Sequence, residues 1–175
     1  SSAPQSVTLQ QTINLTQAKA GAAVLAKQFG CGITVCDVGV NVKLPDCAVL
    51  NRKIAYGTNK ICIGPAMKRQ QALRAILTGA EIAKKTDADV LGIGEIGIGN
   101  TTTAAAILAV LLDADVEAVT GRGGGITDRS FFKKKAVIRT AIARNQPDRQ
   151  DVIDVVSKVG GFDIAAMCGA FLGAA

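Results

Sequence analysis

The stretch that decides the fold is residues 90–112, which read VLGIGEIGIGNTTTAAAILAVLL. Its first four residues, 90–93, are apolar or small, which is typical of a short buried strand. A glycine-rich loop follows, and an alanine-rich helix is predicted from Asn100 to about Leu112. A strand, a glycine loop and a helix in this order indicate an α/β fold with a parallel sheet and right-handed crossovers.

Upstream of this stretch, helix-like and strand-like patterns alternate. Helices are predicted at 6–13, at about 16–29 and at about 68–85, a strand at 33–38, and a second, short strand at 52–56. Ser6 is expected to cap the first helix, and Gly30 to end the second.

Downstream, a second glycine cluster, Gly121-Arg-Gly-Gly-Gly125, leads to Asp128 and Ser130. Either of these two residues is expected to cap a basic helix that ends near Asn145. Helices at about 151–159 and 162–172 follow. Because no linker divides the 175 residues, we predict one domain.

Composition excludes several classes of function. The chain has no His, which excludes Ser-His-Asp and Cys-His catalysis and any His-ligated zinc. Aromatic residues are only 3%, too few for a base-stacking platform, so no nucleic-acid partner is predicted. The net charge of +6 permits an anionic partner. The basic stretch 129–149 is either a solvated helix face or the source of one or two phosphate contacts.

The cysteines and the apolar runs indicate the cellular compartment of the protein. The five cysteines are odd in number and include no C-x-x-C pair, so we expect reduced thiols in a cytoplasmic protein. The longest unbroken apolar run, 104–112, is too short to span a bilayer, so no membrane partner is predicted.

The first glycine loop leaves two interpretations open. A helix start leaves backbone N–H groups unpaired and favours an anion, and Asn100, Thr101 and Thr102 add side-chain donors. This combination favours a mononucleotide phosphate site. Alternatively, the glycines make a tight turn and Thr101 caps the helix.

The same loop contains Gly92-x-Gly94-x-x-Gly97, formally the dinucleotide fingerprint, with Asp113 at about the right distance beyond it. An oxidoreductase domain is therefore an alternative function. Two features oppose it: the helix is predicted to begin three residues after Gly97, and Glu95 would repel a pyrophosphate in the turn.

Glu95 is the one glutamate that lies in a glycine loop. A carboxylate at the carboxyl end of a strand, beside a helix start, lies where α/β folds bind ligands. It could orient a nitrogenous ring or assist proton transfer, or it could simply satisfy loop amides.

Six blocks of the sequence, in order, resemble one family. They are 4–10, Val35-Cys-Asp-Val-Gly-Val40, the pair Gly57-Thr-Asn59 and Gly64-Pro-Ala-Met67, Gly94-Glu-Ile-Gly-Ile-Gly-Asn-Thr-Thr102, Gly121-Arg-Gly-Gly-Gly125 with Asp128, and Gly160-Gly-Phe-Asp-Ile-Ala-Ala166. On these blocks the chain resembles the nicotinate-nucleotide:dimethylbenzimidazole phosphoribosyltransferases, which activate the lower ligand of cobamides.

The resemblance implies a fold and a reaction. The fold is an α/β three-layer sandwich with a parallel, Rossmann-like sheet flanked by helices, plus part of a small helical domain. The reaction moves phosphoribose from nicotinate mononucleotide to an aromatic base (benzimidazole, purine or phenol). It gives an α-riboside phosphate for cobamide (vitamin B12-type) biosynthesis and needs no metal and no cofactor.

The resemblance also assigns residues. Glu95 matches a catalytic glutamate near the aromatic base, and Lys134 matches a lysine that meets the phosphate or ribose. Matches to the family's phosphate loop are Gly97, Gly99, Asn100, Thr101 and Thr102. Ser2 and Gln10 fall where the family lines the base pocket.

Departures from the family pattern set further expectations. Gly124 and Thr127 stand where the family more usually has Thr and Asp. The family's upstream Asp-His-Gly-Val segment and its downstream segment with the principal catalytic glutamate do not occur in residues 1–175. The chain is therefore expected to be the central part of the domain, as a fragment, a split subunit or half of a heterodimer. Relatives are dimeric, so a homodimer or a heterodimer with a homologous subunit is expected, and a non-catalytic partner subunit is an alternative function.

Overall fold

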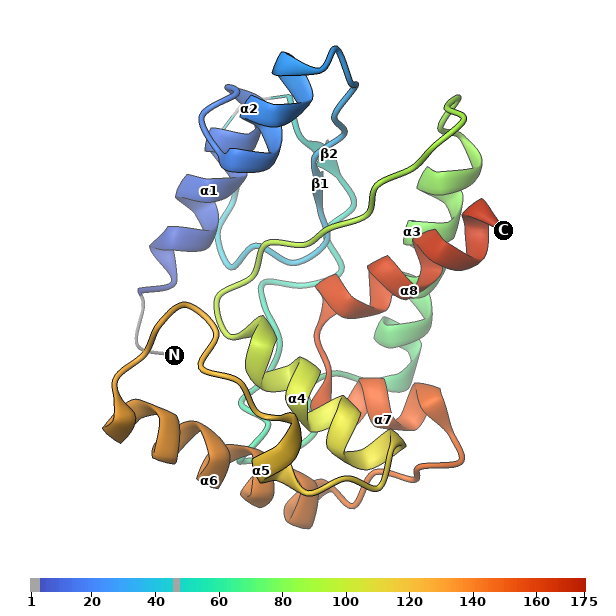
Figure 1. The fold of residues 1–175 in the computed structure, drawn as a ribbon. Helices are drawn as coiled ribbons and strands as arrows, with labels where there is room; N and C mark the ends of the chain where they lie inside the picture. Colours follow the sequence, from blue (N-terminus) through green and yellow to red (C-terminus); the bar gives the residue numbers. More distant parts are fainter. Residues whose placement is uncertain (1–3, 46–47) are drawn as a thin grey trace.

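The computed structural model describes residues 4–45 and 48–175. Over these residues the chain forms eight helices and one two-stranded sheet (Figure 1). The elements are α1 Ser6–Thr16, α2 Gly21–Gln28, β1 Cys36–Asp37, β2 Leu50–Asn51, α3 Arg69–Lys84, α4 Asn100–Leu111, α5 Val116–Val119, α6 Asp128–Asn145, α7 Val152–Val159 and α8 Phe162–Ala174. The protein is thus mostly helical with a small parallel sheet, which is compatible with an α/β fold.

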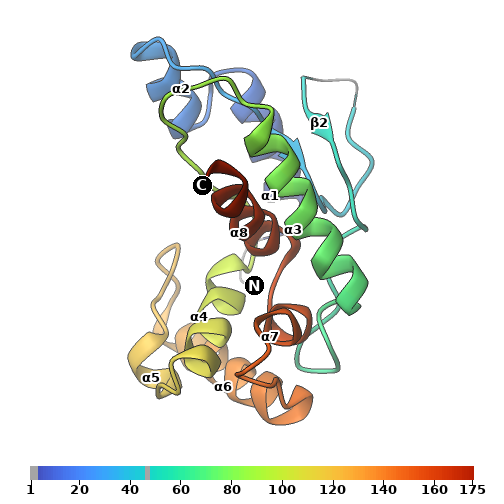
Figure 2. The same cartoon turned by 90° about the vertical axis from the view of Figure 1, so that its right-hand side faces the viewer.

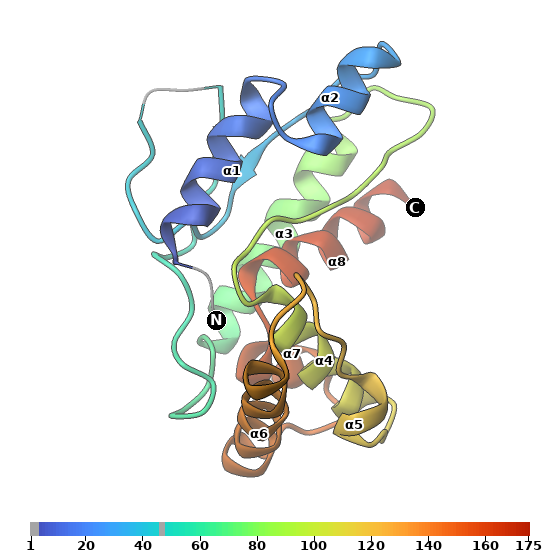
Figure 3. The same cartoon turned by 60° about the vertical axis from the view of Figure 1, so that its left-hand side comes forward.

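The helices other than α3 and α8 lie in two groups at opposite ends of the molecule (Figure 1). Helices α4, α5, α6 and α7 lie together at one end, and α1 and α2 lie at the other (Figures 1 and 3). The extended segment 88–99 crosses the molecule from the end of α3 to the start of α4 (Figure 1). The glycine loop is thereby brought to the middle of the molecule, beside the start of α4.

Helices α3 and α8 cross in close contact (Figure 2), and glycines make this possible. A Cβ on Gly79 would overlap the Ala166 carbonyl, and one on Gly169 would overlap the Ile76 carbonyl. The two backbones therefore touch directly, and any larger residue at these glycines would push the helices apart.

The hydrophobic core lies where α3, α4, α6, α7 and α8 meet, and small side chains dominate it. Its most buried members include Ala75, Ala106, Ile138 and Val155. Phe162, at the start of α8, links the core to the sheet side of the molecule. Its Cδ2 lies 2.7 Å from the position of a Cβ on Gly39, just after β1.

The sheet is shorter than predicted. Strand β1 pairs parallel to β2, with Cys36 opposite Leu50 and Asp37 opposite Asn51. The prediction of a buried strand over 33–38 is therefore wrong except at these two residues, and Ile33 is 47% exposed. The second strand lies just before the predicted 52–56. Among the described residues, backbone hydrogen bonds join the two segments only between residues 35–38 and 50–54, where the amides of Leu50 and Ile54 donate to the carbonyls of Val35 and Val38. An apolar run forms a strand only where a neighbouring backbone supplies hydrogen bonds.

Asp37 ends β1 and anchors the turn that follows. Its side chain is buried, its Oδ1 accepts hydrogen bonds from the Gly39 and Val40 amides at 3.0 and 2.8 Å, and Lys53 Nζ lies 2.6 Å from its Oδ2. A buried carboxylate needs such partners, because an uncompensated charge in the interior is costly. We therefore assign Asp37 a structural role.

The predicted strand at 90–93 does not form within the described residues. The segment is extended without ladder hydrogen bonds, and Val90 is 87% exposed. The three-layer sandwich is accordingly not seen in residues 4–45 and 48–175.

Two predicted helix starts are also wrong. Ser6 is the first helical residue of α1 rather than its cap, because the helix already begins after Gln5. Thr127, not Asp128 or Ser130, caps α6, and its hydroxyl oxygen accepts the Ser130 amide. The predicted helix 16–29 is divided: α1 runs on to Thr16, and α2 begins only at Gly21.

The other helices agree with the sequence patterns. Helices α3, α4 and α6 end within one residue of their predicted limits, and Gly30 has the positive φ of +66° that favours glycine after a helix. Among the described cysteines, Cys31, Cys36, Cys62 and Cys168 are free thiols. In residues 4–45 and 48–175 there is no helix with the length and apolar character needed to cross a membrane.

Candidate functional site

The site is built around the loop 94–99 and the start of α4. Gly99 stands at the N-cap with a φ of +101°, a conformation that residues with a Cβ rarely adopt. Helix α1 fixes the loop from the side, because the Thr8 hydroxyl oxygen accepts the Ile98 amide at 3.2 Å. Because glycine has no side chain, nothing from the N-cap covers the positive end of the helix dipole.

Asn100, the first residue of α4, holds the loop to the helix. Its Nδ2 donates to Glu95 Oε1, and its Oδ1 accepts the Thr101 amide at 2.6 Å. Asn100 therefore fixes Glu95 directly beside the helix start.

Lys134 joins the two glycine loops. Its side chain comes from α6, the residue is only 9% exposed, and its Nζ donates to Thr101 Oγ1 and to the Gly121 carbonyl, both at 2.8 Å. Burial lowers the pKa of this ammonium group. Among the described residues no carboxylate pairs with Lys134, so its charge is available to an anion.

The second glycine loop packs on the first through Thr101. Gly123 has a φ of +66°, and a Cβ there would lie 2.8 Å from Thr101 Oγ1. Glycine at this position therefore permits the approach of the two loops. The preceding residue, Arg122, forms an ion pair with Asp128, so its charge already has a partner.

The structure brings together most of the residues predicted for the site. Glu95, Asn100, Thr101 and Lys134 form one chain of hydrogen bonds. Gly97 and Gly99 belong to the same loop, and Thr102 follows in the first turn of α4, where its amide donates to the Gly99 carbonyl at 2.9 Å.

Of the two residues predicted for the base pocket, the structure describes only Gln10. Gln10 is exposed on α1, the helix whose Thr8 contacts the loop, and it makes no side-chain hydrogen bond within the described part of the chain. Ser2 lies outside the described residues.

Asp163 is a residue of the site that the sequence analysis did not single out. It lies in the first turn of α8, and its Oδ2 is 2.6 Å from the position of a Cβ on Gly97. Glu95 Oε2 lies 3.8 Å from the same point. The signal was available, because Asp163 is the acid in the Gly160-Gly-Phe-Asp block and the one charged residue of α8.

Both carboxyl groups hold protons more tightly than usual. Although Glu95 is an exposed residue, the pKa of its carboxyl group is raised, first by partial desolvation and then by the charge and hydrogen bonding of Asp163, while the Asn100 hydrogen bond opposes the shift. Burial also raises the pKa of Asp163. Perturbed acids in a loop beside a helix start are typical of functional sites.

The dinucleotide fingerprint does not take its usual form. Helix α4 begins at Asn100, as predicted, and not directly after Gly97. Gly92 and Gly94 lie in the exposed extended segment. The geometry therefore disfavours a pyrophosphate turn here.

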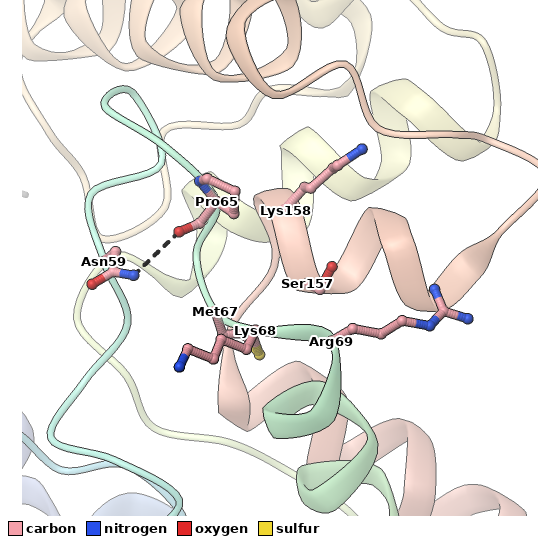
Figure 4. A pocket seen from close by; sticks show the side chains of 7 residues that line it. All are labelled: Asn59, Pro65, Met67, Lys68, Arg69, Ser157 and Lys158. Atoms are coloured by element: carbon pink, nitrogen blue, oxygen red, sulfur yellow. Dashed lines mark hydrogen bonds between the residues drawn. The ribbon is translucent and has the colours of Figure 1, made fainter.

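A separate hollow of about 490 Å³ lies at the start of α3 beside α7 (Figure 4). It contains none of the predicted site residues. Its lining is Asn59, Pro65, Met67, Lys68, Arg69, Ser157 and Lys158. Arg69 is paired with Asp151 at 2.6 Å and Lys158 with Asp154 at 2.8 Å, so two of its three cations already have partners.

A glycine at the N-cap of α4, a buried lysine and two adjacent glycine loops are features typical of sites for phosphate-bearing ligands. The family model described as "Phosphoribosyltransferase" matches residues 1–175. The chain therefore belongs to this phosphoribosyltransferase family.

Named relatives agree with this assignment. The nicotinate-nucleotide–dimethylbenzimidazole phosphoribosyltransferase of Clostridium tetani is 43% identical over 100% of this chain and 49% of its own length. The same enzyme of Alkaliphilus metalliredigens is 47% identical over 98% of this chain and 50% of its own length.

A solved structure, CobT from Thermus thermophilus, is 38% identical with a TM-score of 0.93, over 99% of this chain and 53% of that one. The chain thus spans about half the length of the relatives that it matches.

Proposed function

We propose that the protein transfers phosphoribose from nicotinate mononucleotide to an aromatic base, giving an α-riboside phosphate for cobamide biosynthesis. The observation that carries this proposal is Lys134, a buried cation that bridges Thr101 and Gly121 beside a helix start. The names of the relatives support the same reaction.

In this proposal the phosphate lies between the start of α4 and Lys134. The lysine ammonium supplies charge-assisted hydrogen bonds, and the helix dipole adds to the attraction. The phosphate competes with Asn100 Oδ1 for the Thr101 amide, whose hydrogen bond to that oxygen is 2.6 Å long. The expected roles of Gly97, Gly99 and Thr102 are to let the backbone close around the phosphate.

Glu95 is proposed as a catalytic residue that orients the accepting base for attack. A ring nitrogen of the accepting base attacks the anomeric carbon, the bond from that carbon to nicotinate breaks, and its electrons neutralise the cationic nicotinate ring. The proton of the accepting base passes to a carboxylate, and the resemblance assigns this role to the principal catalytic glutamate of the family's downstream segment. Benzimidazole, purine and phenol are all candidate acceptors, and Ser2 and Gln10 are proposed to line their pocket.

We also propose that residues 1–175 correspond to the central part of the phosphoribosyltransferase domain. In that domain the extended segments 33–38 and 90–93 would join a parallel sheet of a three-layer sandwich. A dimer, either of identical chains or with a homologous subunit, and a cytoplasmic location complete the proposal.

Calorimetric titration with nicotinate mononucleotide and, separately, with NAD tests the site. We expect binding of the mononucleotide, and tight binding of NAD without mononucleotide binding would overturn the proposal in favour of a dinucleotide-binding domain. Nicotinate release is then measured in the complete native polypeptide that carries residues 1–175, with benzimidazole, adenine or phenol as acceptor. Mononucleotide binding without release would instead identify a non-catalytic partner subunit.

A further inference from the structure

The second glycine loop, residues 121–126, depends on side chains for its shape. Figure 3 shows this segment rising from α5 and returning to α6. None of its amides donates a well-formed hydrogen bond to a backbone carbonyl in the described part of the chain. Residues 123–125 are all glycine, and the φ angles of Gly123 and Gly125 are +66° and +77°. Because glycine leaves the backbone many alternative conformations, contacts from elsewhere must select this one.

Arg122 provides these contacts. Its Nη1 donates to the Ile126 carbonyl at 3.1 Å, and its Nη2 forms the ion pair with Asp128 Oδ1. The guanidinium carbon also lies 4.9 Å from the centre of the Phe131 ring, within the range of a cation–π interaction. One guanidinium group thus links the start of the loop to its end and to the first turn of α6.

Both neighbours of Arg122 in the sequence contact the phosphate site. The Gly121 carbonyl accepts a hydrogen bond from Lys134 Nζ, and Thr101 Oγ1 accepts another, both at 2.8 Å. On the other side, a Cβ on Gly123 would lie 2.8 Å from the same Thr101 oxygen. An ammonium group has three N–H donors, so Lys134 keeps one for an anion. The direction of that donor depends on where Gly121 and Thr101 lie.

The Arg122 guanidinium itself is occupied away from this site. Its side chain is half-exposed, and its partners are Ile126, Asp128 and Phe131 rather than Lys134 or Thr101. An exposed ion pair of this kind contributes little to the stability of the fold. The effect of Arg122 is therefore expected in the geometry of the loop and not in the free energy of unfolding.

We propose that Arg122 is a positioning residue for Lys134: it closes the second glycine loop, and the closed loop keeps the Gly121 carbonyl where it orients the ammonium group toward the phosphate. This inference rests on the proposed function. A lysine that is already oriented loses less conformational freedom when the phosphate binds, so the affinity is higher. The planar fork of arginine matters here, because two of its N–H groups serve Ile126 and Asp128 at once, which a lysine ammonium does not reproduce.

Calorimetric titration of the complete native polypeptide with nicotinate mononucleotide tests the inference. Arg122→Lys keeps the charge but loses the fork, and we expect binding to weaken by about five- to tenfold. The matched control is Arg149→Gln, because Arg149 and Asp113 are 47% and 78% exposed, and Arg122 and Asp128 are 50% and 76% exposed. This control removes a charge outright and should still bind within about twofold of the parent. Equal affinity in Arg122→Lys and the parent would overturn the inference.

A double-mutant cycle separates positioning from a direct phosphate contact. If Arg122 acts through Lys134, adding Arg122→Lys to Lys134→Met should cause no further loss of affinity. Additive losses would mean that Arg122 acts on the ligand independently, and they would overturn the inference. Urea denaturation provides the check on folding, and Arg122→Lys should unfold at the same midpoint as Arg149→Gln. A clearly lower midpoint in Arg122→Lys would assign its loss of binding to folding and would equally overturn the inference.

NMR of isotope-labelled lysine ammonium groups distinguishes failure of this inference from failure of the proposed function. Lys134 is identified as the signal that is absent from Lys134→Met. In the parent its protons should exchange slowly with water, because the group is buried and hydrogen-bonded. Exchange should be faster in Arg122→Lys and unchanged in Arg149→Gln. If the parent binds no nicotinate mononucleotide, the proposed function fails, and the ammonium signal still decides the positioning role. The same exchange in Arg122→Lys and the parent would overturn it.

Discussion

The chain contains two glycine loops that precede helices, 94–99 before α4 and 121–125 before α6, and they end differently. The first runs directly into its helix, with Gly99 as an N-cap that has no side chain. The second is followed by Thr127, whose hydroxyl oxygen accepts the Ser130 amide and so caps α6. A similar composition therefore leaves the N-cap of one helix without a side chain and gives the other a hydroxyl cap. The second loop contributes instead a carbonyl, that of Gly121, which holds Lys134.

The difference teaches that glycine content alone does not identify an anion site. What matters is which residue stands at the N-cap and which cation reaches it. Lys134 lies on α6, after the second loop, and its side chain reaches Thr101 at the start of α4, after the first loop. The second loop and its helix therefore supply the cation for the first loop. Four substitutions test this division of roles, from the largest expected effect to the smallest.

Glu95→Gln tests whether the first loop carries the chemistry. We expect phosphoribosyl transfer to fall by about 10²-fold, because a neutral amide lacks the negative charge that holds the N–H group of the accepting base in place for attack. The affinity for nicotinate mononucleotide should stay within about twofold, since Gln can still accept the Asn100 hydrogen bond. Steady-state kinetics and calorimetry on the complete native polypeptide provide the two measurements, and equal turnover in mutant and parent would remove Glu95 from the mechanism.

Lys134→Met removes the cation that links the loops. Loss of a charge-assisted hydrogen bond to phosphate should weaken nicotinate mononucleotide binding by about 10- to 100-fold. Its exposed neighbour provides the matched control, and Lys133→Met should bind as the parent does. Calorimetry compares the two variants, and similar losses in both would reduce Lys134 to a contributor to the general positive charge.

Gly99→Ala places a Cβ on the N-cap of α4. The φ of +101° should cost the variant about 1–2 kcal/mol in free energy of unfolding. Gly124→Ala is the control from the second loop, because Gly124 has no positive φ and an added Cβ there meets no atom within 4 Å. Urea denaturation of both variants measures the difference, and equal stabilities would mean that the first loop is not strained.

Thr127→Ala removes the cap of the second loop. We expect a loss of about 1 kcal/mol in the free energy of unfolding, because the Ser130 amide loses its acceptor. Thr127→Ser should retain most of the stability, since Ser caps as well as Thr. If Ala and Ser behave alike in urea denaturation, the second helix start does not depend on its cap.

Much of the fold could be read from local patterns. The periodicity of apolar residues predicted α3, the alanine-rich run predicted α4, and both helices begin and end close to the expected residues. Strands were less predictable: residues 90–93 have the apolar character of a strand, but the described residues offer them no partner. A helix closes its hydrogen bonds within one segment, whereas a strand depends on another.

The candidate site likewise combines residues that local sequence predicted with residues that only the folded chain brings together. Glu95 and Asn100 lie in one loop, and Lys134 was placed with them by resemblance rather than by any local pattern. Asp163 was missed as a site residue: the Gly160-Gly-Phe-Asp block marks it in the sequence, but the block does not indicate that it faces Glu95. The proximity arises only when the start of α8 packs beside Gly97.

The sequence by itself determined the helices, the two glycine loops and the chemical groups that they carry. These depend on propensity, periodicity and turn residues, which act over a few positions. Tertiary structure alone decided that Lys134 is buried against Thr101 and that Asp163 shares the space beside Gly97 with Glu95. Burial and the approach of two like charges arise from packing between distant segments. Both influences change how strongly an ionisable group holds its proton.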